Sequence, residues 1–230
     1  MRLAACLLLL AVGACDIIAR EDKSVFPPAD RPVSDIVSSQ FSDEASRDRV
    51  NEAETVMDMA DIEEGMTVAD IGAGNGYYTV RLAPRVGDRG RVLAQDVIPE
   101  TRDRLAERVT REQLDNVSVR LGEFADPKLP PDSFDRIFMV HMYHEIESPY
   151  EFLWNMRPAL REGGRVIVVD ADRPTNRHGT PPDLLECEFE AVGYRRVVYR
   201  PMPDMGGYFA MFERVGERPE PEEIEPCGQD

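Results

Sequence analysis

The stretch Val68-Ala-Asp-Ile-Gly-Ala-Gly-Asn-Gly76 decides the fold of this chain. It joins a short apolar run, which we expect to be a strand, to a turn with glycine at every second position. Glycine lacks a Cβ atom and adopts positive φ angles at little cost, so the chain can bend sharply and a ligand can lie against bare backbone. Ligands of open α/β sheets bind at the carboxyl ends of the strands, where this turn falls. The stretch therefore predicts a ligand-binding strand–turn–helix unit.

The spacing of these glycines argues against a dinucleotide ligand. The pyrophosphate fingerprint Gly-x-Gly-x-x-Gly would place its third glycine where Tyr77 stands. Asp70, just before the turn, is badly placed for a phosphate but well placed for a ligand that carries an ammonium group. Asp96 ends the next predicted strand, and a carboxylate there can accept both hydroxyls of a ribose. The alternative is an ordinary glycine turn and an aspartate that caps a helix. Together the features favour a cationic nucleoside.

Apolar runs and helical periodicities alternate along the chain. This alternation implies an α/β fold with a doubly wound, mostly parallel sheet covered by helices on both faces. The last two strands follow each other like a hairpin, so we expect seven strands with an antiparallel last strand. The predicted strands are 67–71, 91–96, 117–121, 135–140, 165–170, 196–199 and 208–213, and the predicted helices are 42–60, 78–86, 99–111, 150–160 and 183–192.

Composition and charge set limits on the kind of protein. The chain has 230 residues, of which 42% are hydrophobic, so one globular domain is expected, and we place it at 42–214. The net charge of −17 repels the phosphates of nucleic acids, so no nucleic-acid partner is predicted. Residues 215–230 are acidic and proline-rich, which predicts a disordered tail. Because Cys227 lies in that tail, a disulfide with Cys187 is disfavoured but left open.

The first residues differ from the rest of the chain. Arg2 precedes an apolar run at 3–14, which is too short to span a bilayer as a helix but suits a signal peptide at 1–14. Val12-Gly13-Ala14-Cys15 resembles the lipobox of bacterial lipoproteins. The resemblance implies lipidation of Cys15, a tether or linker at 15–41, and a membrane-anchored protein of the cell envelope that faces the periplasm. The alternatives are an ordinary cleaved signal or a misassigned start, the latter giving a cytoplasmic protein.

From residue 42 to residue 213 the sequence resembles the class I S-adenosylmethionine-dependent methyltransferases of the small-molecule group, which includes the quinone-ring methyltransferases. The match rests on residues 68–76 for the first motif, Asp96 for the acidic position of the second, Leu121-Gly-Glu-Phe124, and Leu160-Arg-Glu-Gly-Gly-Arg-Val166. The resemblance implies a Rossmann-like methyltransferase fold and S-adenosylmethionine as cofactor. It also implies methyl transfer to a small-molecule or lipid-like acceptor.

The same resemblance assigns the cofactor-binding residues. Asp70 would orient the ammonium group, Asp96 the ribose hydroxyls, and Glu123 the adenine amino group. Phe124 and Val140 would contact the cofactor through their backbones. The full set is Asp70, Gly72, Ala73, Gly74, Gly76, Asp96, Val97, Glu123, Phe124 and Val140.

Catalytic residues are harder to assign, because methyl transfer from a sulfonium needs alignment more than a universal base. His144 and Tyr77 are the candidates; His144 can also be structural, and Tyr77 a core aromatic. Asp170 and Asp172 end the fifth strand and either meet the substrate or cap a helix. A metal site from His141, His144 and Glu145 lacks the His-Glu-x-x-His order, so no metal is predicted.

Two other functions remain possible at this stage. Because S-adenosylmethionine is made in the cytoplasm, an exported chain raises the alternative of a non-catalytic envelope lipoprotein that uses the fold as a binding module. A nicotinamide reductase is opposed by Tyr77 and by the expected antiparallel last strand. The oligomeric state stays open.

Overall fold

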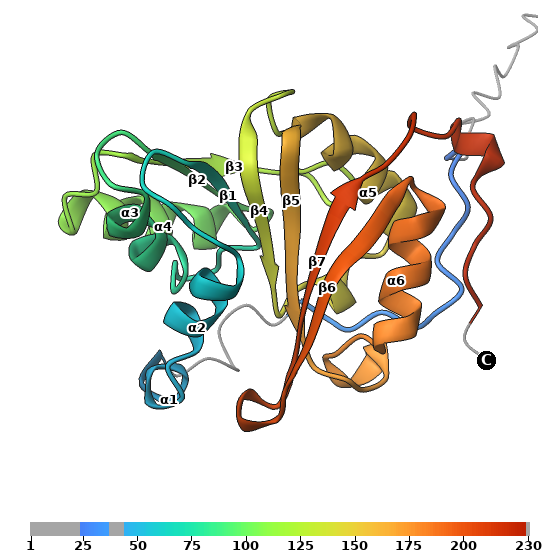
Figure 1. The fold of residues 1–230 in the computed structure, drawn as a ribbon, viewed down its shortest axis with the longest axis horizontal. Coiled ribbons are helices and arrows are strands. Elements are labelled where there is room, and N and C mark those ends of the chain that lie inside the picture. The colour runs from blue at the N-terminus through green and yellow to red at the C-terminus, as the bar shows by residue number, and fades with distance from the viewer. Residues whose placement is uncertain (1–23, 37–43, 229–230) are drawn as a thin grey trace, which may run out of the picture.

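The computed structural model describes residues 24–36 and 44–228 (Figure 1). The predicted signal peptide and Cys15 lie outside these ranges, so the lipidation prediction has no structural counterpart here. Within the described ranges, no helix has the length and apolar character needed to cross a membrane.

The described residues form a seven-stranded sheet with the order β3-β2-β1-β4-β5-β7-β6. Neighbouring strands from β3 to β5 pair in parallel, whereas β7 runs antiparallel to both β5 and β6. This confirms the predicted mixed, doubly wound α/β fold. The strands are β1 Thr67–Ile71, β2 Arg91–Asp96, β3 Val117–Leu121, β4 Phe134–Val140, β5 Leu160–Asp170, β6 Tyr194–Met202 and β7 Gly207–Arg214.

The register of the parallel strands sets the position of the site. Ile71, the last residue of β1, pairs with Gln95 of β2 on one side and with Met139 of β4 on the other. The residues that follow these strands therefore emerge at the same edge of the sheet. They are the glycine loop, Asp96 and the segment that begins at His141.

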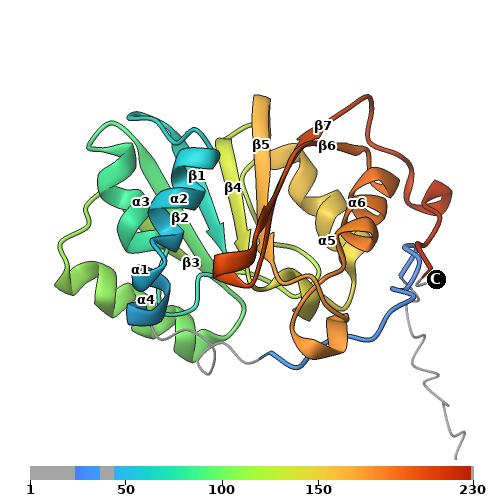
Figure 2. The same cartoon turned by 60° about the horizontal axis from the view of Figure 1, so that its bottom comes forward.

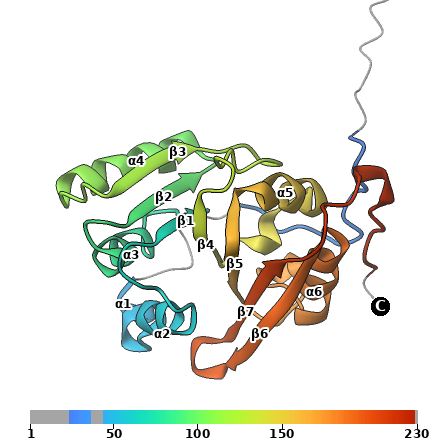
Figure 3. The ribbon, with the colours of Figure 1, turned by 45° about the horizontal axis from the view of Figure 1, so that its top comes forward.

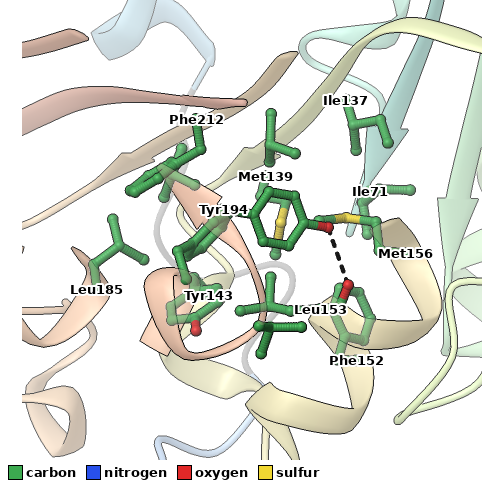
Figure 4. Packing of buried hydrophobic residues seen from close by; sticks show 14 of the residues in the cluster. Ile71, Ile137, Met139, Tyr143, Phe152, Leu153, Met156, Leu185, Tyr194 and Phe212 are labelled. Atoms are coloured by element: carbon green, nitrogen blue, oxygen red, sulfur yellow. Dashed lines mark hydrogen bonds between the residues drawn. The ribbon is translucent and has the colours of Figure 1, made fainter. Parts of the chain in front are cut away.

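Helices cover both faces of the sheet, α2 and α3 on one side and α5 and α6 on the other (Figure 3). The apolar cluster beneath α5 and α6 includes large aromatic side chains such as Tyr194, whose hydroxyl donates to the carbonyl of Leu153 (Figure 4). The α-helices are α1 Glu44–Arg49, α2 Glu52–Met59, α3 Thr79–Val86, α4 Pro99–Arg111, α5 Pro149–Met156 and α6 Pro182–Ala191.

The first helical segment differs from the prediction of one helix at 42–60. The chain forms two helices, α1 and α2, because Asn51 between them has the left-handed φ of 53°. Helix α1 lies beside α4, where Arg108 Nη1 donates to Glu44 Oε1 at 2.5 Å (Figure 2). This break lets α1 lie across the carboxyl edge of the sheet.

The segment at 24–36 is packed on the domain rather than being a free tether. Arg31 Nε donates to Glu188 Oε1 of α6 at 2.8 Å, and both side chains are fully buried. Tyr143 donates to the other carboxylate oxygen of Glu188 at 2.7 Å. A carboxylate buried in an apolar cluster needs such partners, so the domain requires Arg31 from outside the predicted boundary.

The carboxyl-terminal segment is also packed, so the prediction of disorder is wrong for residues 215–228. Ile224 and Cys227 are buried, and Cys227 forms a disulfide with Cys187 of α6. Gly228 pairs with Asp30, so the two ends of the described chain lie side by side (Figure 1). Composition predicted disorder because it takes no account of a covalent link to the domain.

Candidate functional site

The glycine loop is fastened onto the end of β2 by backbone hydrogen bonds. The N–H of Ala73 donates to the Gln95 carbonyl at 2.9 Å, and the N–H of Gly74 donates to Asp96 Oδ2 at 3.0 Å. Gly72, Gly74 and Gly76 all have positive φ angles, between 56° and 87°. These conformations explain why glycine occupies each of the three positions.

Asp96 is buried at the end of β2, with its carboxylate held by backbone donors. Oδ1 accepts from the N–H of Ile98 at 2.9 Å, and Oδ2 accepts from Gly74. Burial raises the pKa of Asp96, and these backbone N–H groups partly oppose the rise. Each carboxylate oxygen has a second lone pair, so Asp96 can accept further hydrogen bonds from a ligand.

A cavity of about 510 Å³ opens beside this loop, within the range typical of small-molecule sites. Most of the predicted cofactor-binding residues line it. They are Gly72, Ala73, Gly74, Asp96, Val97, Phe124 and Val140.

Three predicted cofactor residues do not line the cavity. Asp70 is buried behind the loop, where Thr79 Oγ1 donates to its Oδ2 at 2.6 Å. Gly76 faces α4, since a Cβ atom there would lie 2.4 Å from Leu105 Cδ1. The Glu123 side chain is 68% exposed and pairs with Lys128. Burial raises the pKa of Asp70 to about 6, so the negative charge under the loop depends on pH.

Gln95 lines the cavity, although sequence reasoning did not single it out. Its side chain fills the space that a Cβ atom on Gly122 would need. Its Nε2 is buried and has no hydrogen-bond partner among the described residues. This nitrogen packs against Gly122, which does not line the cavity, so only other atoms of Gln95 face a ligand there.

Arg47 and Glu52, also missed from the sequence, bring charges to the lining of the cavity. Arg47 Nη2 donates to Glu52 Oε1 at 2.5 Å, and His141 Nε2 lies 3.4 Å from the same oxygen. Burial by itself would raise the pKa of Glu52, but the hydrogen bonds from His141 and Arg47 lower it to about 2. The sequence offered one signal for this charged pair. Glu52 lies one turn before Val56 on the apolar face of α2, and a charged residue on an apolar face indicates a buried polar contact.

Tyr77 forms part of the cavity wall, and its hydroxyl is engaged elsewhere. The ring lies between the guanidinium groups of Arg47 and Arg81, 3.8 Å and 3.9 Å from its centroid, and the hydroxyl donates to Asp48 at 2.9 Å. Burial and this carboxylate raise the pKa of Tyr77 to about 12. A phenol that stays protonated at neutral pH is a poor general base, which leaves Tyr77 a wall residue.

His144 lies on the cavity in the short 3-10 turn Tyr143–Glu145 that follows β4, and its orientation is set by Asp170. Its Nδ1 lies 3.0 Å and 3.1 Å from the two carboxylate oxygens of Asp170, which is fully buried at the end of β5. Asp170 also accepts from Thr180 Oγ1 at 2.8 Å. Asp170 thus acts on the site through His144, whereas Asp172 is exposed and does not line the cavity.

Comparison with known proteins fits this geometry. Residues 62–195, more than half of the chain, match the family described as "Methyltransferase domain". In structure, the chain resembles a SAM-dependent methyltransferase from Aquifex aeolicus with a TM-score of 0.66 and 27% identity, over 73% of this chain and 91% of that one.

Two curated relatives are similar over part of their length. A protein-L-isoaspartate O-methyltransferase of Methanothrix thermoacetophila is 31% identical over 48% of this chain and 50% of the relative. A ubiquinone/menaquinone biosynthesis C-methyltransferase of Methylococcus capsulatus is 33% identical over 50% of this chain and 46% of the relative. The chain therefore spans about half the length of these curated relatives. The cofactor implied by these matches is S-adenosylmethionine, and the chain belongs to the methyltransferase domain family.

Proposed function

We propose that this protein transfers the methyl group of S-adenosylmethionine to a small-molecule or lipid-like acceptor. The observation that carries the proposal is the contact between Gly74 and Asp96 at the edge of the cavity. It joins a bare-backbone surface to a buried carboxylate, the two features that a ribose-bearing ligand needs.

The residues around the cavity fit the cofactor. Asp96 would accept from the ribose hydroxyls, and Gly72 would lie against the cofactor with its bare backbone. Val97 and Phe124 would border the adenine. Asp70 would act from beneath the loop, as a charge that favours the ammonium group. The side chain of Glu123 is exposed, so we assign it at most a contact with the edge of the adenine ring.

The bound cofactor supplies a methyl group on a sulfonium with a neutral leaving group. The chain must align an acceptor with that methyl group and exclude water. The Asp170 carboxylate accepts from Nδ1–H of His144, which leaves Nε2 as the acceptor nitrogen on the cavity side. His144 therefore presents a nitrogen with a free lone pair to the methyl acceptor.

Both charge and cavity lining favour a small acceptor over a nucleic acid. The chain carries a net charge of −17, which repels phosphate backbones. The cavity lining includes apolar side chains, among them Met142, Phe152 and Met205. An organic molecule with an apolar body fits such a lining.

We also propose that the protein acts in the cell envelope. The disulfide between Cys187 and Cys227 supports this, because disulfides persist in oxidising compartments and are rare in the cytosol. The lipobox-like sequence ending at Cys15 supports it independently. Palmitate labelling that is lost in Cys15→Ser would support the anchor, and unlabelled cytosolic protein would refute it.

Calorimetric titration of the purified full-length chain with S-adenosylmethionine tests the function. We expect saturable binding with a dissociation constant on the order of micromolar. A folded sample that gives no binding would refute the proposal. Transfer of a radiolabelled methyl group to extracted metabolites or lipids would then distinguish an enzyme from a binding module, which would bind the cofactor without transferring the label.

A further inference from the structure

We propose that His144, Glu145 and His178 form a binding site for a divalent transition-metal ion on the wall of the cavity. The three residues each offer a ligand atom, and these atoms all lie within 4.8 Å of one another. All three residues line the cavity. Zinc binds imidazole nitrogen and carboxylate oxygen at about 2.0–2.2 Å, which places such atoms roughly 3–4 Å apart around one ion. The limit of 4.8 Å is somewhat longer than this spacing, and small side-chain rotations would bring the ligand atoms close enough to share one ion.

The orientation of His144 is the one that a metal ligand needs. A histidine that binds a metal through one nitrogen usually donates its other N–H to a carboxylate, which fixes the ring and its tautomer. Asp170 is that carboxylate here, at 3.0 Å from Nδ1. The backbone N–H of Ala171 and the hydroxyl of Thr180 hold Asp170 in turn, at 2.9 Å and 2.8 Å. Nε2 of His144 is therefore presented as the ligand atom.

Ser34 holds the two histidine-bearing segments together. Its N–H donates to the carbonyl of His144 at 3.2 Å, and its hydroxyl accepts from the N–H of His178 at 3.2 Å. The same hydroxyl donates to the carbonyl of Thr175. His178 has the left-handed conformation, with φ of 55° and ψ of 59°, which few residue types adopt. The packed segment at 24–36 thus links the backbones that carry the two imidazoles.

The ligand set indicates the kind of metal. Two imidazoles and one carboxylate suit zinc and the neighbouring first-row divalent ions, whereas magnesium and calcium prefer oxygen ligands throughout. Three protein ligands leave a coordination position open toward the cavity. On the proposed function, a donor atom of the methyl acceptor would occupy that position. Metal binding itself does not depend on the proposed function.

The test uses the full-length chain without a histidine tag, in a Cys6→Ser/Cys15→Ser background that removes the two thiols outside the disulfide. After chelator treatment, Co²⁺ is added and its visible absorption followed, and Zn²⁺ is then titrated in competition. We expect one ion per chain. Glu145→Gln, His144→Gln and His178→Asn should each weaken binding by more than about 100-fold, and Asp170→Asn by about 10- to 100-fold. Asparagine at 178 is chosen because it tolerates the left-handed conformation.

The third histidine of the chain supplies the matched control. His141 lines the same cavity but is not in the ligand group, so His141→Gln should keep the metal affinity of the parent. Absence of stoichiometric binding by the folded parent would overturn the proposal, as would equal affinities in the parent and the Glu145→Gln variant. S-adenosylmethionine is titrated into the same samples. A sample that binds the cofactor but no metal ion would refute the metal site and leave the proposed methyltransferase function standing.

Discussion

The backbone N–H of Gly74 donates to Oδ2 of Asp96 at 3.0 Å, so the bend after β1 and the carboxylate that ends β2 meet at one edge of the sheet. Had these two ends pointed apart, no common ligand could contact both. Their contact, with a cavity beside it, is what connects the glycine motif to a nucleoside-binding site.

Replacing Asp96 by asparagine should weaken binding of S-adenosylmethionine. The neutral amide loses hydrogen bonds to a charged acceptor that are worth about 1.5–3 kcal/mol, or roughly a 10- to 100-fold rise in Kd. Calorimetric titration measures the change. The exposed Asp88 provides the control, because Asp88→Asn should bind the cofactor as the parent does. Equal affinities of the Asp96 variant and the parent would remove the ribose role from this residue.

Gly72→Ala should lower both stability and cofactor affinity. Gly72 has φ of +65°, and an added Cβ would lie 3.0 Å from Met142 Cγ. A left-handed conformation costs alanine about 1–2 kcal/mol, before any contact with Met142. Denaturant unfolding measures the first effect and calorimetric titration the second.

Gly163→Ala is the matched control for this prediction. Gly163 has a similar φ of +74° but no atom within 4 Å of the added Cβ. It should therefore lose about the same 1–2 kcal/mol of stability and keep its cofactor affinity. Equal cofactor affinities in the two variants would show that the loop does not contact the ligand.

Asp70→Asn should stabilise the protein at pH 7.5 and weaken cofactor binding. The pKa of Asp70 is raised from 3.8 to about 6 by burial, so between these values the folded chain holds a proton that the unfolded chain has lost. The free energy of unfolding therefore falls as pH rises from about 4 to 6, by roughly 3 kcal/mol for a shift of about two units.

The amide at position 70 should remove that dependence. Thermal unfolding at pH 4 and at pH 7.5 checks this, since the variant should gain stability over the parent only at the higher pH. In the parent, affinity for the cationic cofactor should rise with pH through about 6 as Asp70 ionises. A loss of stability at pH 7.5 would contradict the buried-charge explanation.

Reduction of the disulfide should lower stability by roughly 2–4 kcal/mol, because it closes a loop of 40 residues. Intact-mass measurement with and without reductant shows whether the bond forms, and thermal unfolding gives its contribution. Cys187→Ser/Cys227→Ser should match the reduced parent and be insensitive to reductant. A parent that unfolds identically in both conditions would show that the disulfide adds nothing to the stability of the domain.

Local patterns were sufficient for the sheet and for placing the glycine turn and Asp96 on the cavity. The strand at 67–71 and the strand at 91–96 follow from apolar runs that end in turn residues, and Gly72 and Asp96 follow from their place after those strands. The break at Asn51 was not predicted, because the apolar periodicity on either side of it is continuous with a single helix. Its conformation depends on where α1 packs against α4.

The sequence by itself determined the alternation of strands and helices, the glycine turn and the acid after the second strand, because these depend on residues that are neighbours in the chain. Only the tertiary structure decided that Arg31 neutralises Glu188, that Cys187 bonds Cys227, and that His178 lies beside His144. The partners in these pairs are far apart in sequence. They meet only because closing the sheet and packing its helices bring separate segments to one place, and no local periodicity encodes that approach.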